Sequence, residues 1–161
     1  MIDYCRGDLS RELSKMMTFK EEMVRFYIAQ LILAIEYLHH QNVIYRDLKP
    51  ENILVDLDGN IKLADFGLSK EGIGDDDKTK SFCGSPAYLS PEVVNNKNKG
   101  SAGYGKSTDI YGIVAVMYEL MVGTPPFLAE EIPEMFKKIT EAELSFPKNL
   151  SIEAKDLMKV F

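Results

Sequence analysis

One short stretch of the chain carries the residue types that phosphoryl transfer requires. The stretch reads YRDLKPEN and ends at Asn52, and the tripeptide DFG begins thirteen residues later at Asp65. Such chemistry needs a carboxylate that orients the attacking hydroxyl and accepts its proton, together with oxygen ligands that hold magnesium against the phosphates. Asp47 suits the first task, and Asn52 and Asp65 suit the second. Lys49 follows closely and would neutralise charge on the transferred group.

The elements that would position these side chains are a hairpin and a long helix. Residues 52–66 contain two short apolar runs joined by an Asp-Gly turn, which predicts a small β-hairpin with a loop on either side. Ahead of it, apolar residues recur at helical spacing over residues 24–38, after Thr18 and Glu21 at capping-box spacing. This pattern predicts a long buried helix that ends near Asn42.

Two further helices are expected in the second half of the chain. Residues 109–121 are apolar nearly all round, which predicts a helix at the centre of the core. Ser107 or Thr108 would cap its start, and Gly123 would stop it. A shorter amphipathic helix should begin after Ser151.

Two polar segments predict exposed loops. Residues 71–80 read EGIGDDDKTK, offer almost nothing to bury and predict a mobile loop, and residues 95–106 predict a second, glycine-containing one. The second loop overlaps the run GSAGYGKS at residues 100–107, which matches the phosphate-binding pattern GxxxxGK[ST]. That pattern works between a buried strand and a helix, and the polar NNKNK ahead of it cannot be a buried strand. A P-loop nucleoside triphosphatase is therefore the remote alternative.

Two metal-binding patterns fail on closer reading. The run that starts at Asp56 imitates a calcium-binding EF-hand loop, but its sixth and twelfth positions hold Ile61 and Gly67 where that loop needs Gly and Glu. A hairpin turn explains the run. His39 and His40 have no cysteine or paired histidine at ligand spacing, so a helix-terminal or solvated role is expected.

Composition places the chain among soluble, single-domain globular proteins. It has 161 residues, 45% of them hydrophobic, and a net charge of −6, which argues against general affinity for nucleic acid or anionic membrane. Cys5 and Cys83 are too few and too distant for a disulfide framework or a zinc site. The longest apolar run, residues 110–118, is too short to cross a bilayer, and the N-terminus is too polar for a signal peptide. We expect an intracellular protein without membrane insertion or nucleic-acid partner.

The motifs together resemble those of eukaryotic protein kinases along essentially the whole chain. RDLKPEN, DFG and the SPE of residues 90–92 are similar to the catalytic loop, the metal-binding loop and the end of the activation segment. Tyr45 ahead of the arginine, together with FCGSPAYLSPE at residues 82–92, resembles the AGC group that includes the cyclic-nucleotide-dependent kinases. The Lys-Pro that follows Asp-Leu is similar to the serine/threonine class and not to the tyrosine class.

This resemblance implies a fold, an activity and partners. The fold would be the C-terminal lobe of the protein-kinase-like fold over residues 1–161, mainly α with a small β-hairpin and truncated at both ends. The activity would be transfer of the ATP γ-phosphoryl group, with Mg²⁺, to Ser or Thr of proteins with basic sites. An upstream activating kinase and a cytoplasmic, or also nuclear, location are implied as well. The alternative is a non-catalytic interaction module.

Carried over residue by residue, the resemblance assigns the catalytic, metal and regulatory positions. Asp47 becomes the catalytic base, Lys49 a phosphate contact, and Asn52 a second magnesium ligand beside Asp65. Ser81 falls at the activation-loop phosphorylation site, and Arg46 would bind its phosphate. The remaining nucleotide contacts are Leu54, beneath the adenine, and Asp8.

The resemblance also implies a substrate-binding face. Ser85 matches a hydroxyl residue that bonds near the catalytic Asp and Lys, and Asp109 looks like the helix-start Asp that braces the catalytic loop. The pocket for the residue after the phosphoacceptor would be lined by Phe82, Pro86 and Leu89. The acidic positions that recognise upstream arginines would be Asp8, Glu51 and Glu119.

The sequence departs from the kinase pattern at both ends. IDYCRGDL resembles the hinge between the two kinase lobes, with Met1 at the position closest to the nucleotide, and no glycine-rich loop or strand lysine precedes it. At the other end, the arginine that would pair with Glu92 is not reached. We expect a fragment or incomplete gene product of a longer kinase. Smaller departures are Ala87, Ile110, Tyr111 and Val114.

Overall fold

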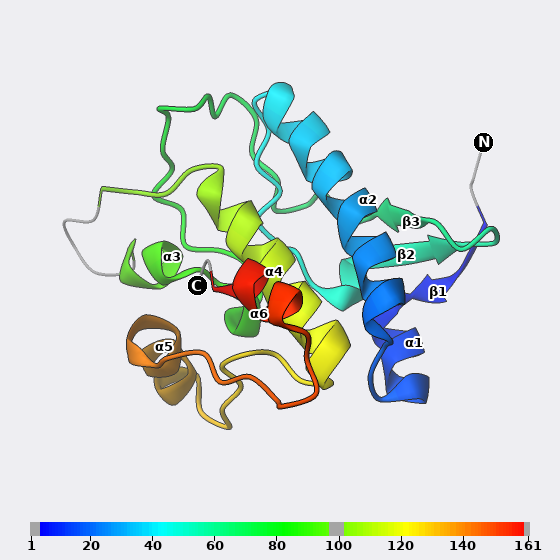
Figure 1. The fold of residues 1–161 in the computed structure, drawn as a ribbon. Coiled ribbons are helices and arrows are strands. Elements are labelled where there is room, and N and C mark those ends of the chain that lie inside the picture. Colours follow the sequence, from blue (N-terminus) through cyan, green and yellow to red (C-terminus); the bar gives the residue numbers. More distant parts are fainter. Residues whose placement is uncertain (1–3, 97–101, 160–161) are drawn as a thin grey trace.

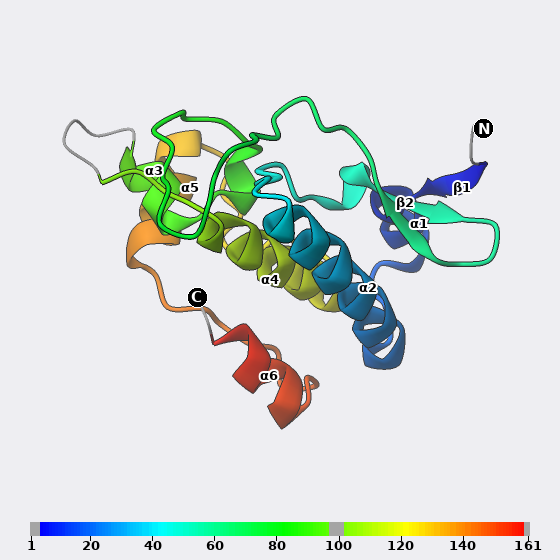
Figure 2. The same ribbon diagram turned by 90° about the horizontal axis from the view of Figure 1, so that it is seen from above.

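The computed structural model describes residues 4–96 and 102–159, which form a mainly helical body with a small sheet at one end (Figure 1). Met1 and Gly100, on which the hinge and phosphate-loop expectations partly depend, lie outside the described residues. Two helices, α2 and α4, run side by side through the body, with the sheet on one side of them and α3 and α5 on the other (Figures 1 and 2). In chain order the elements are β1 (Cys5–Asp8), α1 (Leu9–Met16), α2 (Glu21–His40), η1 (Pro50–Asn52), β2 (Ile53–Asp56), β3 (Ile61–Leu63), η2 (Pro86–Tyr88), α3 (Pro91–Asn96), α4 (Ser107–Val122), α5 (Ile132–Glu141) and α6 (Ile152–Met158).

The expected hairpin is confirmed, and the sheet has one strand more. β2 and β3 pair antiparallel, with Ile53 opposite Leu63, and the Asp56 carboxylate accepts backbone N–H groups across the turn. The calcium-like run is therefore a turn, as expected. The third strand, β1, pairs with the other edge of β2. It was not predicted because its four residues, CRGD, show no apolar alternation.

The long helix is confirmed as α2, although its start differs from the expectation. The stripe of apolar residues faces the core, and Val24 and Leu31 are fully buried. Thr18 was wrongly predicted as the cap, because Lys20 occupies that position and makes no side-chain capping bond. Instead, two acidic residues in the first turn of α2 stabilise its N-terminus by their interaction with the helix dipole.

The central helix is confirmed as α4, whose first turn was also wrongly predicted. Ser107 and Thr108 lie inside the helix, and their hydroxyls bond to Glu92 and Ser90 instead of capping. Gly123 ends the helix in the left-handed conformation, as expected. A Cβ there would lie 2.7 Å from the carbonyl oxygen of Met17, so only glycine fits where the ends of α1 and α4 meet.

The loop of residues 71–80 buries more than its sequence indicated. Ile73 and Thr79 are 4% and 2% exposed, and Thr79 forms an isolated antiparallel bridge with Tyr104. The burial comes from a segment distant in sequence, which local composition cannot reveal. The short last helix, α6, is capped by Ser151 as expected. None of the helices in the described part is both long and apolar enough to span a bilayer.

Candidate active site

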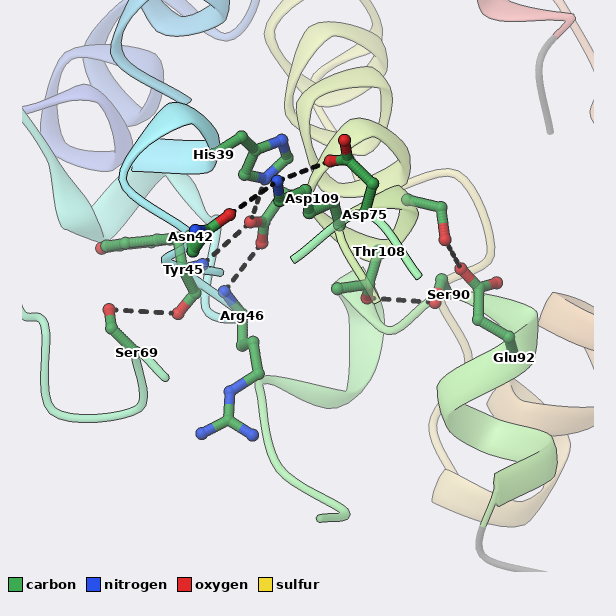
Figure 3. A network of polar contacts seen from close by, with 12 residues as sticks. His39, Asn42, Tyr45, Arg46, Ser69, Asp75, Ser90, Glu92, Thr108 and Asp109 are labelled. Atoms are coloured by element: carbon green, nitrogen blue, oxygen red, sulfur yellow. Dashed lines mark hydrogen bonds and ion pairs between the residues drawn. The ribbon is translucent and has the colours of Figure 1, made fainter. Parts of the chain in front are cut away.

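A buried carboxylate on α4 holds the loop that carries the candidate catalytic residues. Asp109, 1% exposed, accepts the backbone N–H groups of Tyr45 and Arg46, each at 2.8 Å, and lies 2.8 Å from His39 Nε2 (Figure 3). Arg46 has a φ of 70°, which is costly for a residue with a Cβ. The two backbone bonds at Asp109 thus fix the loop where its own conformation is strained.

Asp47 lies at the centre of a hydrogen-bonded cluster. Its Oδ2 accepts from Asn52 Nδ2 at 2.9 Å and lies 3.0 Å from Lys49 Nζ. Its Oδ1 accepts from the backbone N–H of Ser85 at 3.1 Å and from Ser85 Oγ at 2.8 Å. Lys49 Nζ also donates to Ser85 Oγ at 2.9 Å, so the segment of residues 45–52 and the segment that contains Ser85 meet at this carboxylate.

The electrostatics of the cluster keep Asp47 ionised. Burial alone would raise the pKa of Asp47, which is only 6% exposed. Hydrogen bonds from Lys49, Ser85 and Asn52 and the charge of Lys49 outweigh this, so the pKa of Asp47 lies below its ordinary value. A carboxylate with this pKa is available to accept a hydrogen bond from a hydroxyl throughout the neutral range.

The hairpin brings Asp65 to the same end of the sheet as Asn52. Asn52 directly precedes β2 and Asp65 follows β3, and the first residue of β2 pairs with the last of β3. The backbone N–H of Ala64 also bonds to the carbonyl of Asn52 at 2.9 Å. Asp65 is exposed, has a φ of 52° and accepts the N–H of Gly67 at 3.1 Å. The backbone therefore places Asp65 next to Asn52, whose amide nitrogen bonds to Asp47.

Two predicted nucleotide contacts, Asp8 and Leu54, are neighbours in the sheet. They lie opposite each other in the β1–β2 pair. The Asp8 carboxylate caps α1 by accepting the N–H of Arg11 at 2.8 Å, which leaves its other oxygen for a further partner. The sequence had not indicated the cap, because helix α1 itself was not foreseen.

Ser81 is exposed and lies close to more polar groups than the sequence indicated. Its hydroxyl lies 3.3 Å from Thr79 Oγ1, which accepts from Lys70 Nζ at 3.0 Å. Arg46 reaches the same segment through Tyr104, whose hydroxyl donates to the Ser81 carbonyl at 2.6 Å. The sequence did not lead us to expect Lys70 and Tyr104 near Ser81. The one signal for Lys70 was the position of a basic residue shortly after the DFG motif.

The residues expected to bind a peptide divide into exposed and buried groups. Phe82 is 42% exposed and packs edge-on against Phe136 of α5, with ring centroids 6.0 Å apart. Pro86 is half-buried in η2. Leu89, in contrast, is 4% exposed and lies against Gly84, where a Cβ would be 2.7 Å from its Cδ2. Leu89 therefore packs beneath the backbone at Gly84 and does not present an open surface.

The acidic residues of this face are not equally solvated. The Glu119 carboxylate accepts a hydrogen bond from Tyr88 Oη at 2.5 Å, and burial raises the pKa of Glu119, with nearby Glu51 adding to the rise. Glu51 is exposed. Burial also raises the pKa of Tyr88, so its hydroxyl remains a donor at neutral pH. Glu51 is thus near enough for its charge to oppose ionisation of Glu119.

The described residues of the competing motifs have other surroundings than those motifs require. Lys106 pairs with Asp75 at 2.7 Å, and the described residues ahead of the phosphate-loop pattern form helix α3 and not a strand. Among residues 4–96 and 102–159, no group of three or more His, Cys, Asp or Glu side chains is arranged to hold a metal ion. Glu92, for which the expected arginine partner is not reached, accepts from Ser107 Oγ at 3.1 Å.

Comparison with known proteins gives a consistent result. The family model described as "Protein kinase domain" matches residues 1–161. The chain is 48% identical over 152 residues to the serine/threonine-protein kinase akt-2 of Caenorhabditis elegans, covering 94% of the chain and 28% of that protein. It is 46% identical over 152 residues to the human RAC-beta serine/threonine-protein kinase (94% and 31%), and 45% identical over 161 residues to the ribosomal protein S6 kinase alpha-6 of Danio rerio (99% and 21%). The chain thus spans less than a third of each of these relatives.

Proposed function

Because this chain belongs to the protein kinase family, and is similar to serine/threonine kinases of the AGC type, we propose that it transfers the ATP γ-phosphoryl group to Ser or Thr of proteins. We further propose that residues 1–161 correspond to the hinge and the C-terminal lobe of that fold. The observation that carries the proposal is the Asp47 cluster, where a buried, ionised carboxylate lies beside an ammonium group and an amide at one end of a hairpin. Protein substrates and an upstream activating kinase are the partners this function requires.

The geometry supports different roles for Asp47 and Lys49 in the transfer. Four donors from Asn52, Lys49 and Ser85 hold the Asp47 carboxylate in place, so a substrate hydroxyl that donates to it is oriented toward the phosphorus and can release its proton there. Lys49, half-buried beside this carboxylate, would offset negative charge as it develops on the transferred group. Ser85 links both side chains, so the activation segment must be in place for either to act.

The donor set at the end of the hairpin fits magnesium. Asn52 directs its amide nitrogen to Asp47, which turns its carbonyl oxygen away, and Asp65 offers an exposed carboxylate. Mg²⁺ binds through one or two such protein oxygens while keeping water and phosphate ligands. When bound there, the ion would neutralise the phosphates of ATP. Leu54 and Asp8, neighbours in the sheet, would contact the nucleoside.

A phosphate on Ser81 would find cationic partners near it. Lys70 already reaches the adjacent Thr79 hydroxyl, and Arg46 approaches the Ser81 backbone through Tyr104. Charge-assisted hydrogen bonds from these groups would stabilise the modified segment next to Asp47. Ser81 is thus proposed as the activating phosphorylation site.

The acidic pair of Glu51 and Glu119 supports a preference for basic substrates. An arginine upstream of the phosphoacceptor would bring its guanidinium to these carboxylates, while Phe82 and Pro86 contact the residue that follows. Such substrates agree with the net charge of −6. We propose a cytoplasmic, or also nuclear, site of action.

A transfer assay on the full-length protein tests the function. Radiolabelled phosphate from Mg-ATP should enter a Ser peptide with upstream arginines and not its Ser-to-Ala counterpart, and the rate should fall when alanine replaces the arginines. The alternative, an interaction module, predicts no transfer to any peptide and no heat of binding when Mg-ATP is titrated into the full-length protein.

Replacing Lys49 by Met is expected to lower kcat/KM by about 100-fold, because a positioned charge at the reacting group is lost. It should also move the acid limb of the pH profile. Lys49 lowers the pKa of Asp47, so without it the active ionised form disappears at a higher pH. Because the ordinary pKa of an Asp carboxyl is 3.8 and that of Asp47 lies lower, kcat/KM is measured from about pH 3 to 8 to check both effects. Lys148→Met, at an exposed position, is the matched control, and an unchanged profile for Lys49→Met would exclude this role.

A further inference from the structure

Tyr104 joins two segments that are distant in the sequence. Its backbone pairs with that of Thr79 through bonds of 2.8 and 3.0 Å, and its side chain is only 2% exposed. The glycines on either side permit this close approach. A Cβ at Gly103 would lie 2.9 Å from the Thr79 carbonyl oxygen, and one at Gly105 would lie 3.0 Å from that of Asp77. The two glycines of the sequence GYG therefore allow this segment to pack closely against the loop of residues 71–80.

The hydroxyl of Tyr104 meets three groups on two functional segments. It donates to the carbonyl oxygen of Ser81 at 2.6 Å and accepts from Arg46 Nη1 at 3.4 Å. The Cys83 Sγ lies 3.6 Å away. Because the single hydroxyl proton goes to Ser81, the thiol of Cys83 is the donor in that contact. Burial raises the pKa of Tyr104 to about 12, so the hydroxyl keeps its proton at neutral pH.

The bond from Tyr104 uses the backbone of Ser81 and not its side chain. The Ser81 hydroxyl lies instead near Thr79 Oγ1. The Tyr104 contact is therefore compatible with an unmodified and with a phosphorylated Ser81. Arg46, which the same hydroxyl holds, is the residue next to Asp47 in the chain.

We propose that Tyr104 is a positioning residue, whose hydroxyl ties Arg46 to the backbone of residues 81–83 and keeps the activation segment ordered while Ser81 is unmodified. Phosphorylation of Ser81 would add charge-assisted contacts to the segment that this tie already holds. The inference rests on the proposed function, since the tie affects catalysis only if the loop of Arg46 and Asp47 reacts with substrate.

Thiol labelling tests the tie without any assay of transfer. In full-length protein in which every cysteine except Cys83 is replaced by Ser, the reaction rate with the disulfide reagent DTNB reports how often residues 81–83 open. Tyr104→Phe should raise this rate by about 10-fold, the equivalent of one buried hydrogen bond. Tyr37→Phe, which removes a hydroxyl from a side chain that is 65% exposed, is the matched control and should leave the rate unchanged. Equal rates in the two variants would overturn the proposal.

A second variant weakens the same tie by straining the backbone. Gly103 has a φ of +83°, so Gly103→Ala strains the pairing with Thr79 while it leaves the Tyr104 hydroxyl present. Its Cys83 rate should also rise. If Tyr104→Phe gives no folded protein by circular dichroism, this variant decides, and an unchanged rate for a folded Gly103→Ala would overturn the proposal.

Kinetics of the full-length protein separate positioning from general packing. Tyr104→Phe should lower kcat several-fold more in a Ser81→Ala background than in protein phosphorylated at Ser81, with little change in KM for ATP. An equal loss in both backgrounds contradicts the inference. Should the parent protein show no transfer at all, the proposed function fails, while the labelling result still decides whether the tie exists.

Discussion

Replacing Asp47 by Asn should reduce phosphoryl transfer by the full-length protein by about 1,000-fold, within the range that loss of a general base produces. The amide keeps the shape of the carboxylate but cannot accept a proton from the substrate hydroxyl. It also turns an N–H₂ group toward the donors of Asn52, Lys49 and Ser85. Initial rates with saturating Mg-ATP and an arginine-containing peptide measure the effect.

The fold of this variant should survive. The loss of good hydrogen bonds at a site that is 6% exposed should cost about 1–2 kcal/mol of unfolding free energy, which circular dichroism during urea unfolding would detect. Asp58→Asn, at the exposed tip of the hairpin, is the matched control for transfer and should retain full activity. Near-normal transfer by a folded Asp47→Asn protein would remove Asp47 from the catalytic role.

Replacing Asp109 by Ala should lower the unfolding free energy by about 3–5 kcal/mol. The carboxylate serves the backbone N–H groups of Tyr45 and Arg46 and the ring of His39, so its removal leaves three polar groups without their acceptor around a site that is 1% exposed. Arg46 would then lose the bonds that offset its left-handed backbone. Urea unfolding followed by circular dichroism gives the difference.

A surface aspartate provides the comparison for Asp109. Asp156 on α6 is 59% exposed in its side chain and pairs with Lys159, so Asp156→Ala should change stability by no more than about 0.5 kcal/mol. A similarly small loss for Asp109→Ala would mean that the catalytic loop is held mainly by other contacts. In that case the transfer rate of the variant should also stay close to that of the parent.

Local patterns in the sequence were sufficient for the elements that form from neighbouring residues. The hairpin, α2, α4 and the ends at Gly123 and Ser151 each depend on spacing within one segment, and all five are confirmed. The family resemblance is confirmed as well, because RDLKPEN and DFG carry it in two short strings.

The features that the sequence did not reveal depend on partners far along the chain. β1 exists because β2 offers a free edge, and Thr79 is buried because Tyr104 pairs with it from 25 residues away. The caps expected at Thr18 and Ser107 were wrong because tertiary contacts set where each helix begins. The roles of Asp47, Asn52 and Asp65 remain proposals, now with a geometry that supports them.

Helix α4, which holds Tyr45 and Arg46 through Asp109, is also largely enclosed in the core. Thr108, Asp109 and nearly every residue from Gly112 to Met121 are buried, so α4 cannot melt locally without exposing the interior. The amide hydrogens of Tyr45 and Arg46, bonded to this helix, should therefore exchange with solvent only when the whole molecule opens. The backbone geometry of Tyr45 and Arg46 should then last as long as the folded state, whereas the contacts of Asp47 with Ser85 can still open with residues 81–85.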